Sequence, residues 1–213
     1  MKKLALVLAM GLASVNAYAV DIVGLNNTGA GLTAPAQDTN YTVTTPSSTV
    51  GYGYLTTNGT FPLAGNWLEN DTTSSWLTPT ANQGESLDTA VDGIYTWTTT
   101  FNLTGYDAST ASFTGRFAAD NSAIAYLNGQ QIGTSTGFSS WSSFSASASS
   151  FVAGVNTLSF VLTNQAQASG NPTGLRVEFL SSSVAAVPEP DTYALMLAGF
   201  GLMGMVVRRK NAA

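Results

Sequence analysis

The side chains in this chain that could do chemistry are carboxylates, amides and aromatic rings, because the chain has no cysteine and no histidine. Thiol nucleophiles, Cys/His zinc sites and Ser-His-Asp arrangements are therefore excluded. Two acid pairs, Glu69 with Asp71 and Glu85 with Asp88, have the residue types that glycoside hydrolysis needs. Both pairs lie in polar, turn-like segments, which is typical of solvated acids. We therefore predict a non-catalytic protein, with a polysaccharide-active enzyme as the less favoured alternative.

Sugar binding is a second kind of chemistry, and it needs neutral hydrogen-bonding groups and exposed aromatic rings. The candidate ligand-binding residues lie in or beside expected loops: Asp120, Asn121, Trp141, Asn164 and Asn171. The alternative for the Asp and Asn side chains is that they bond their own backbone in turns. The alternative for Trp141 is a place in the core.

The elements that would position these residues are short β-strands. Apolar and polar residues alternate within residues 94–103, 111–117, 158–162 and 175–179, and a period of two is typical of half-buried strands. Asn128-Gly129 can adopt the positive φ angles of a tight hairpin turn. The pattern predicts an all-β fold, an antiparallel β-sandwich.

The sandwich is expected to span residues 63–180. Residues 20–62 are rich in Gly, Thr and Pro, which predicts an irregular N-terminal lead. Residues 181–187 are small and uncharged, which predicts a flexible tether.

The N-terminus has the three parts of a secretory signal peptide. Lys2 and Lys3 supply positive charge, an apolar core follows at residues 4–12, and Ala17 and Ala19 form an A-x-A cleavage site. The sequence therefore predicts a signal peptide at residues 1–19, export by the secretion machinery, and a mature protein that begins at Val20.

The C-terminus has three ordered features: a Pro-Glu-Pro motif, an apolar run of 16 residues (192–207) and a basic end. The residues of the motif and of the basic end are Val187, Pro188, Glu189, Pro190, Arg208, Arg209 and Lys210. A helix of 16 residues is about 24 Å long, whereas the hydrocarbon core of a bilayer is about 30 Å thick. The run predicts a single apolar helix that is short for a permanent membrane anchor.

These features resemble the PEP-CTERM sorting signal of Gram-negative bacteria that make exopolysaccharide. The resemblance implies that a membrane enzyme, exosortase, recognises the Pro-Glu-Pro element and removes the short transmembrane helix within residues 188–210. The chain would be held transiently in the inner membrane and would end at the cell surface or in the extracellular matrix. A C-terminal anchor that is never cleaved is the alternative.

The sandwich carries a resemblance of its own, in the segments "WLENDTTSSWLTP", "GIYTWTTTFNLTG", "FTGRFAADNSAIAYLNGQQIG", "FVAGVNTLSFVL" and "NPTGLRVEF". Their order resembles the galactose-binding-like jelly-roll domains of PEP-CTERM proteins, and "DNSAIAYLNGQQIG" is similar to sugar-binding β-sandwich modules of glycosidases. The resemblance implies a jelly-roll-type β-sandwich. It also implies a structural calcium at Asp38 and Glu178, which offer the hard oxygen ligands that calcium prefers. The alternative for Glu178, which alternates outward beside Arg176, is a plain surface acid.

Between residues 20 and 187 the chain carries two arginines against ten acidic residues, a net charge of −8. A surface this negative repels nucleic acid, so we expect no nucleic-acid partner. We predict an exported, non-catalytic protein that associates with extracellular polysaccharide through its galactose-binding-like module. The alternative is a passive structural matrix protein without glycan binding.

Overall fold

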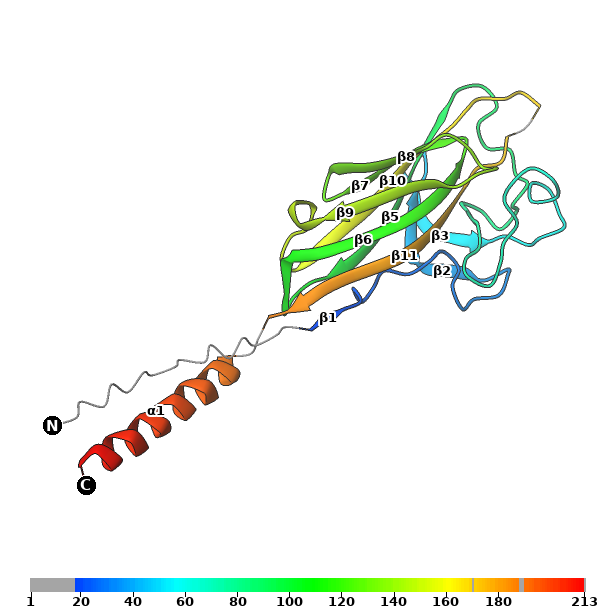
Figure 1. Ribbon diagram of the computed structural model, residues 1–213. Helices are drawn as coiled ribbons and strands as arrows, with labels where there is room; N and C mark the ends of the chain where they lie inside the picture. The colour runs from blue at the N-terminus through cyan, green and yellow to red at the C-terminus, as the bar shows by residue number, and fades with distance from the viewer. Residues whose placement is uncertain (1–17, 170, 188–189, 213) are drawn as a thin grey trace. The chain divides into compact units, whose positions relative to one another are not determined.

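The computed structural model describes residues 18–169, 171–187 and 190–212 (Figure 1). Ala19–Ala185 form one compact unit, to which the C-terminal helix does not belong. The elements are β1 (Ala19–Val20), β2 (Gln37–Thr44), β3 (Val50–Leu55), β4 (Leu77–Thr78), β5 (Gly93–Asn102), β6 (Tyr106–Asp120), β7 (Ser122–Leu127), β8 (Gln130–Ser135), β9 (Ser142–Ser147), the 3-10 helix η1 (Ala148–Ser150), β10 (Val155–Asn164), β11 (Gly174–Ala186) and α1 (Pro190–Ala212). Ala17, Pro188 and Glu189, named above as processing residues, lie outside the described part.

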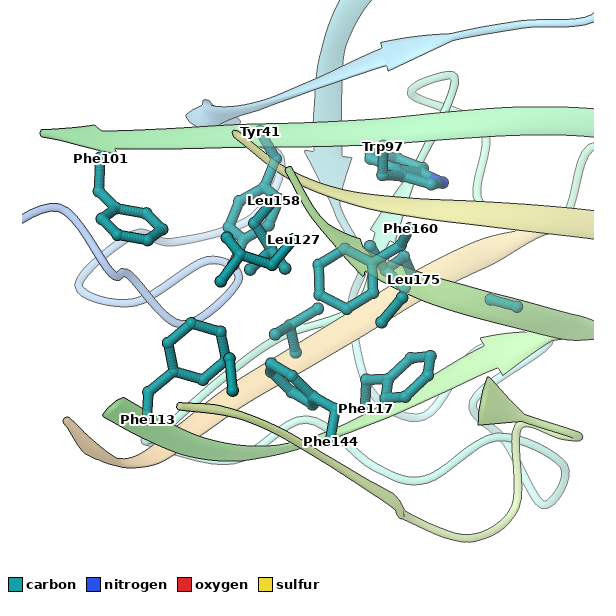
Figure 2. Packing of buried hydrophobic residues seen from close by; sticks show 14 of the residues in the cluster. Tyr41, Trp97, Phe101, Phe113, Phe117, Leu127, Phe144, Leu158, Phe160 and Leu175 are labelled. Carbon is teal, nitrogen blue, oxygen red and sulfur yellow. The ribbon is translucent and has the colours of Figure 1, made fainter. Parts of the chain in front are cut away.

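The strands form one mostly antiparallel sheet that closes on itself. Neighbouring strands follow the order β1-β11-β4-β3-β2-β5-β10-β7-β8-β9-β6, and β6 also pairs with β11. The closed sheet folds into two layers whose inward side chains meet in the core (Figure 2). The predicted all-β sandwich is therefore confirmed.

The hairpin between β7 and β8 turns at the expected place. Asn128 has a φ of 51° and Gly129 a φ of 83°, and a tight type I′ turn needs positive φ at both central residues. Asn128 also ties the turn to the rest of the sandwich, because its amide nitrogen donates to the carbonyl of Ser150 at 2.9 Å and to Oδ1 of Asn156 at 2.8 Å.

Phenylalanine rings join the two layers. Phe117 on β6 and Phe144 on β9 face Phe160 on β10 (Figure 2), with ring centroids 5.3 and 5.7 Å apart. Such aromatic pairs contribute about 0.5–1.5 kcal/mol each beyond the burial of their surface. Gly115 makes room for them, since a Cβ there would lie 2.5 Å from the ring of Phe144 and 2.7 Å from the carbonyl oxygen of Glu178.

The expectation of an irregular lead at residues 20–62 was wrong. Strands β2 and β3 lie within it, and β2 pairs with β5 through Thr42↔Thr98 and its two neighbouring pairs. Tyr41 and Val43, which alternate with threonines, are buried in the core. The alternation of Tyr41 and Val43 with threonines is a local strand signal, but it lies within a Gly- and Pro-rich segment, and the pairing of β2 with β5 is set by contacts between residues distant in the sequence.

The expectation of a flexible tether at residues 181–187 was also wrong. Strand β11 continues to Ala186, and its end pairs with β1 through Val184↔Val20 and Ala185↔Ala19. The side chain of Val184 is buried, and the Ala185 amide donates to Oγ1 of Thr110 at 2.9 Å. Small, uncharged residues can thus extend a strand when two neighbours supply its partners.

The expected C-terminal helix is present as α1, and its last turn holds Arg209 and Lys210. Within the described residues, however, no helix combines the length and the apolarity that crossing a membrane requires. The described residues therefore do not show the predicted transmembrane helix.

Candidate functional site

Asp120, a predicted ligand-binding residue, is an internal group at the end of β6. Its side chain is 3% exposed, its Oδ2 accepts a hydrogen bond of 2.7 Å from Nε1 of Trp67, and its buried Oδ1 has no partner among the described residues. Burial raises the pKa of Asp120 to about 7, although the hydrogen bond from Trp67 acts in the opposite direction. A carboxyl group placed in this way cannot reach a glycan in solvent.

Asn121, Asn164 and Asn171 come together, as the prediction required, but they bind one another. The Asn171 amide nitrogen donates to Oδ1 of Asn121 and to Oδ1 of Asn164, each at 2.9 Å. Asn164 in turn donates to Oδ2 of Asp88 at 2.8 Å. Asn164 and Asn171 are both buried. This amide network holds the loop between β10 and β11 in place, and it corrects the expectation that these side chains face a ligand.

Trp141, the predicted aromatic platform, is half-buried under two arginines. The guanidinium carbon of Arg116 lies 4.4 Å from the ring centroid and that of Arg176 lies 4.8 Å from it. The ring also packs on a small cluster that includes Trp67 and Trp76, whose ring centroids are 4.3 Å apart with the planes tilted by 35°. The cation–π contacts occupy the ring that a sugar would need.

Glu178 lies at the centre of a buried charge cluster. Its Oε2 accepts from Nε of Arg116 at 2.6 Å, and its Oε1 accepts from Oγ of Ser74 at 2.7 Å. Nη2 of Arg176 lies 3.4 Å from the same Oε1 and 3.0 Å from the carboxylate of Asp71. Glu178 and Arg176 are each 1% exposed. The expectation that Glu178 is a plain surface acid was therefore wrong.

The residues proposed for calcium do not fit that ion. Glu178 is neutralised by two guanidinium groups, which would repel a cation. Asp38 is buried on β2, where Oδ2 accepts from the Gly29 amide at 2.7 Å and Oδ1 accepts from the Asn40 amide at 2.9 Å. No group of three or more acidic, Cys or His side chains in the described part of the chain could hold a metal.

Three of the four acids in the pairs that could serve hydrolysis are engaged by other groups, and the fourth, Glu69, is exposed. Asp71 accepts from the Thr73 amide at 2.7 Å and pairs with Arg176. Partial burial acts to raise the pKa of Asp71, but these backbone hydrogen bonds and Arg176 outweigh it and lower the pKa overall. Glu85 accepts from Thr80 at 2.6 Å, and Asp88 accepts from Tyr95 at 2.8 Å. This arrangement is consistent with a non-catalytic protein.

An open groove lies elsewhere, where β8 and β9 separate. The two strands pair only at Gly133↔Phe144, and on one side of that pair they leave a groove of about 620 Å³. The lining residues are Ser112, Phe113, Thr114, Gln130, Gln131, Ile132, Gly133, Thr134, Ser145, Ala146, Ser147, Ser149 and Ser150.

The groove has an apolar base and a neutral polar rim. Phe113 and Ala146 are buried core residues and Ile132 is half-buried, so these three form the base. Gln131, Thr134 and Ser145 are exposed and bear amide or hydroxyl groups. The sequence did not indicate these residues. The Asn128-Gly129 turn marks the start of β8, but the separation of β8 from β9 has no local sequence signal.

The tail matches a known family. Residues 186–210 match the family model described as the PEP-CTERM protein-sorting motif, so the predicted sorting signal is confirmed and the chain is marked for export. No curated protein matches the chain.

Solved structures share the β-sandwich only distantly. The chain is similar to the FMN-binding beta-glucuronidase from Facaelibacterium prausnitzii L2-6, with 17% identity and a TM-score of 0.35. The match covers 76% of this chain and 23% of the enzyme. A family 11 carbohydrate-binding module from Clostridium thermocellum, in complex with a beta-1,3-1,4-mixed-linked tetrasaccharide, gives 13% identity and a TM-score of 0.35 over 74% of this chain and 95% of the module. The PA14 sugar-binding domain from an RTX adhesin gives 13% identity and a TM-score of 0.30 over 71% of this chain and 100% of that domain. At these values the likeness does not bear on what this chain binds.

Proposed function

We propose that the chain is an exported, non-catalytic module that binds extracellular polysaccharide in the groove between β8 and β9. The sorting tail delivers the module to the cell surface or the extracellular matrix, after exosortase-type processing. The groove then holds the module on the polysaccharide found there.

The chemistry of the groove carries this proposal. A sugar ring has an apolar face and a rim of hydroxyl groups, and binding sites that suit such ligands combine apolar surface with a few polar groups that fix orientation. Ile132, which is half-buried, supplies apolar surface above the buried Phe113 and Ala146, and the serine, threonine and glutamine side chains of the rim supply donors and acceptors. Because sugar hydroxyls exchange water contacts for similar protein contacts, affinity is expected to be low, with a dissociation constant of about 1 μM to 1 mM.

Replacing Gln131 and Ser145 together by alanine is expected to weaken glycan binding about tenfold or more, which corresponds to about 1.4 kcal/mol. Both side chains are exposed on the rim of the groove, so the free energy of unfolding should change by about 0.5 kcal/mol or less. NMR titration with polysaccharide fragments measures the affinity, and urea denaturation measures the stability.

Thr100→Ala is the matched control, because Thr100 is an exposed hydroxyl on β5 outside the groove. Equal glycan affinity of the control and the double variant would show that the ligand does not bind in the groove. The absence of any titration shift with the unaltered protein would favour the passive matrix protein instead.

The sorting tail is proposed to be cut by an exosortase-type enzyme that recognises the Pro-Glu-Pro element. Glu189 is the one acid of that element, and Arg208, Arg209 and Lys210 are cations of the kind that stay on the inner side of a membrane. Glu189→Ala, or deletion of residues 208–210, should leave most of the chain uncut and associated with cells. Mass spectrometry of the exported protein reports the cut, with Asp107→Ala as a control remote from the tail. Normal release of both tail variants would contradict the proposal.

A further inference from the structure

We infer that the groove selects uncharged polysaccharide and rejects acidic polysaccharide, such as chains of uronic acids. This inference rests on the proposed function, because it names the class of ligand for the same groove. Three features support it: the pairing of the two arginines, the excess of acidic residues on the sandwich, and the neutral lining of the groove.

The sandwich has no cation left over for an acidic sugar. Arg116 and Arg176 are the only basic residues between positions 20 and 187. Arg116 binds the carboxylate of Glu178 through Nε and Nη2, each at 2.6 Å, and Arg176 is buried between Glu178 and Asp71. An acidic sugar is normally bound by a guanidinium or an ammonium group. Within the described part of the sandwich both candidates are already paired, and neither lines the groove.

The remaining charges on the sandwich repel an anionic chain. Ten acids against two arginines leave a net charge of −8 between residues 20 and 187, and a polyanion that approaches such a surface meets a repulsive field at low salt. A divalent cation could bridge two sets of carboxylates, but the described residues contain no cluster of three or more acids that would hold one.

The lining of the groove is neutral throughout. Among the described residues that form it, none is charged, and the exposed ones carry hydroxyl or amide groups. A carboxylate that entered the groove would lose water and would gain no opposite charge, which is costly. A neutral hydroxyl at the same place would exchange water for a side-chain partner at little cost.

The test is affinity electrophoresis of the full chain in gels that contain one polysaccharide each. The neutral polysaccharides are glucan, xylan, galactan and mannan, and the acidic ones are alginate and polygalacturonate. We expect retention by at least one neutral polysaccharide, with an affinity that changes less than about twofold between low and high salt and does not respond to a chelator. Affinity for the acidic polysaccharides should be at least about tenfold weaker.

A lysine placed in the groove sharpens the test. Ser145→Lys puts a cation on the rim, whereas Thr100→Lys adds the same charge on β5, outside the groove. Only Ser145→Lys is expected to gain retention on the acidic polysaccharides at low salt. An equal gain in both variants would show that net charge, and not the groove, sets the selectivity, and would overturn the inference.

The outcomes separate the inference from the proposed function. Salt-sensitive retention of the unaltered chain by an acidic polysaccharide would overturn the neutral selectivity and leave glycan binding intact. Retention by none of the six polysaccharides, at either salt concentration, would count against glycan binding and would remove the inference with it.

Discussion

Replacing Arg176 by methionine is expected to lower the free energy of unfolding by about 3–5 kcal/mol, because it removes one partner from a buried ion pair. The Arg176 side chain is 1% exposed and contacts Glu178, Asp71, Ser74 and the carbonyl oxygen of Glu69. Its loss would leave the buried carboxylate of Glu178 with Arg116 as its only cation. Urea denaturation measures the change through the transition midpoint.

The cluster explains why this effect should be large in a domain with few charges. Arg176 joins β11 to the segment 69–74, which lies between the contacting rings of Trp67 and Trp76 in the sequence. A surface ion pair contributes only about 0–1 kcal/mol, but the loss of Arg176 would leave the buried Glu178 with one guanidinium in place of two, and would remove the charged donor from Ser74 and from the carbonyl oxygen of Glu69.

Two further variants distinguish the loss of the pair from the loss of packing. Arg116→Met removes a charged side chain that is 36% exposed, so its cost should be smaller, about 1–2 kcal/mol. The double variant Arg176→Met with Glu178→Leu replaces both buried charges by apolar groups and should recover part of the stability. A loss below about 1 kcal/mol for Arg176→Met alone would contradict the importance of the cluster.

The second large effect is on pH dependence: the contribution of Asp120 to stability should be lost as the pH rises. Burial raises the pKa of Asp120 from 3.8 to about 7, so the folded protein holds a proton at this group that the unfolded chain releases. The contribution is fully present below about pH 4, decreases between pH 4 and 7, and is gone above pH 7. A change of this size corresponds to about 4 kcal/mol in the free energy of unfolding.

Asp120→Asn should remove this pH dependence. The amide oxygen can still accept the hydrogen bond from Nε1 of Trp67, and the side chain carries no charge at any pH. The difference in free energy of unfolding between the variant and the unaltered protein should shift in favour of the variant by up to about 4 kcal/mol from pH 4 to pH 8. Urea denaturation from pH 4 to pH 9 measures the difference between the two proteins.

Asp107→Asn is the control, because Asp107 is exposed near the start of β6 and its Oδ1 accepts from the Ser109 amide on the same strand. Its stability curve should run parallel to that of the unaltered protein over the same range. If the curve for Asp120→Asn were also parallel, the pKa of Asp120 would be ordinary in the folded state. The cost of burying its ionised carboxylate would then be offset by other groups.

Features that depend on neighbouring residues along the chain could be predicted from the sequence. Alternation placed strands β5, β6, β10 and β11, and Asn128-Gly129 marked the hairpin, because the period of two and the need for positive φ act locally. The sorting tail could be predicted from the sequence as well, since its motif, apolar run and cations follow one another along the chain.

The tertiary structure alone decided which polar residues face solvent and which face the core. Asp120, Asn164 and Glu178 have the residue types of a binding site, yet each is buried and bound to groups far away in the sequence. The groove depends on the point at which β8 leaves β9, with a single residue pair between the two strands. Strand pairing and burial are settled by contacts between residues distant in the sequence, and local composition does not encode which of several alternating segments will become partners.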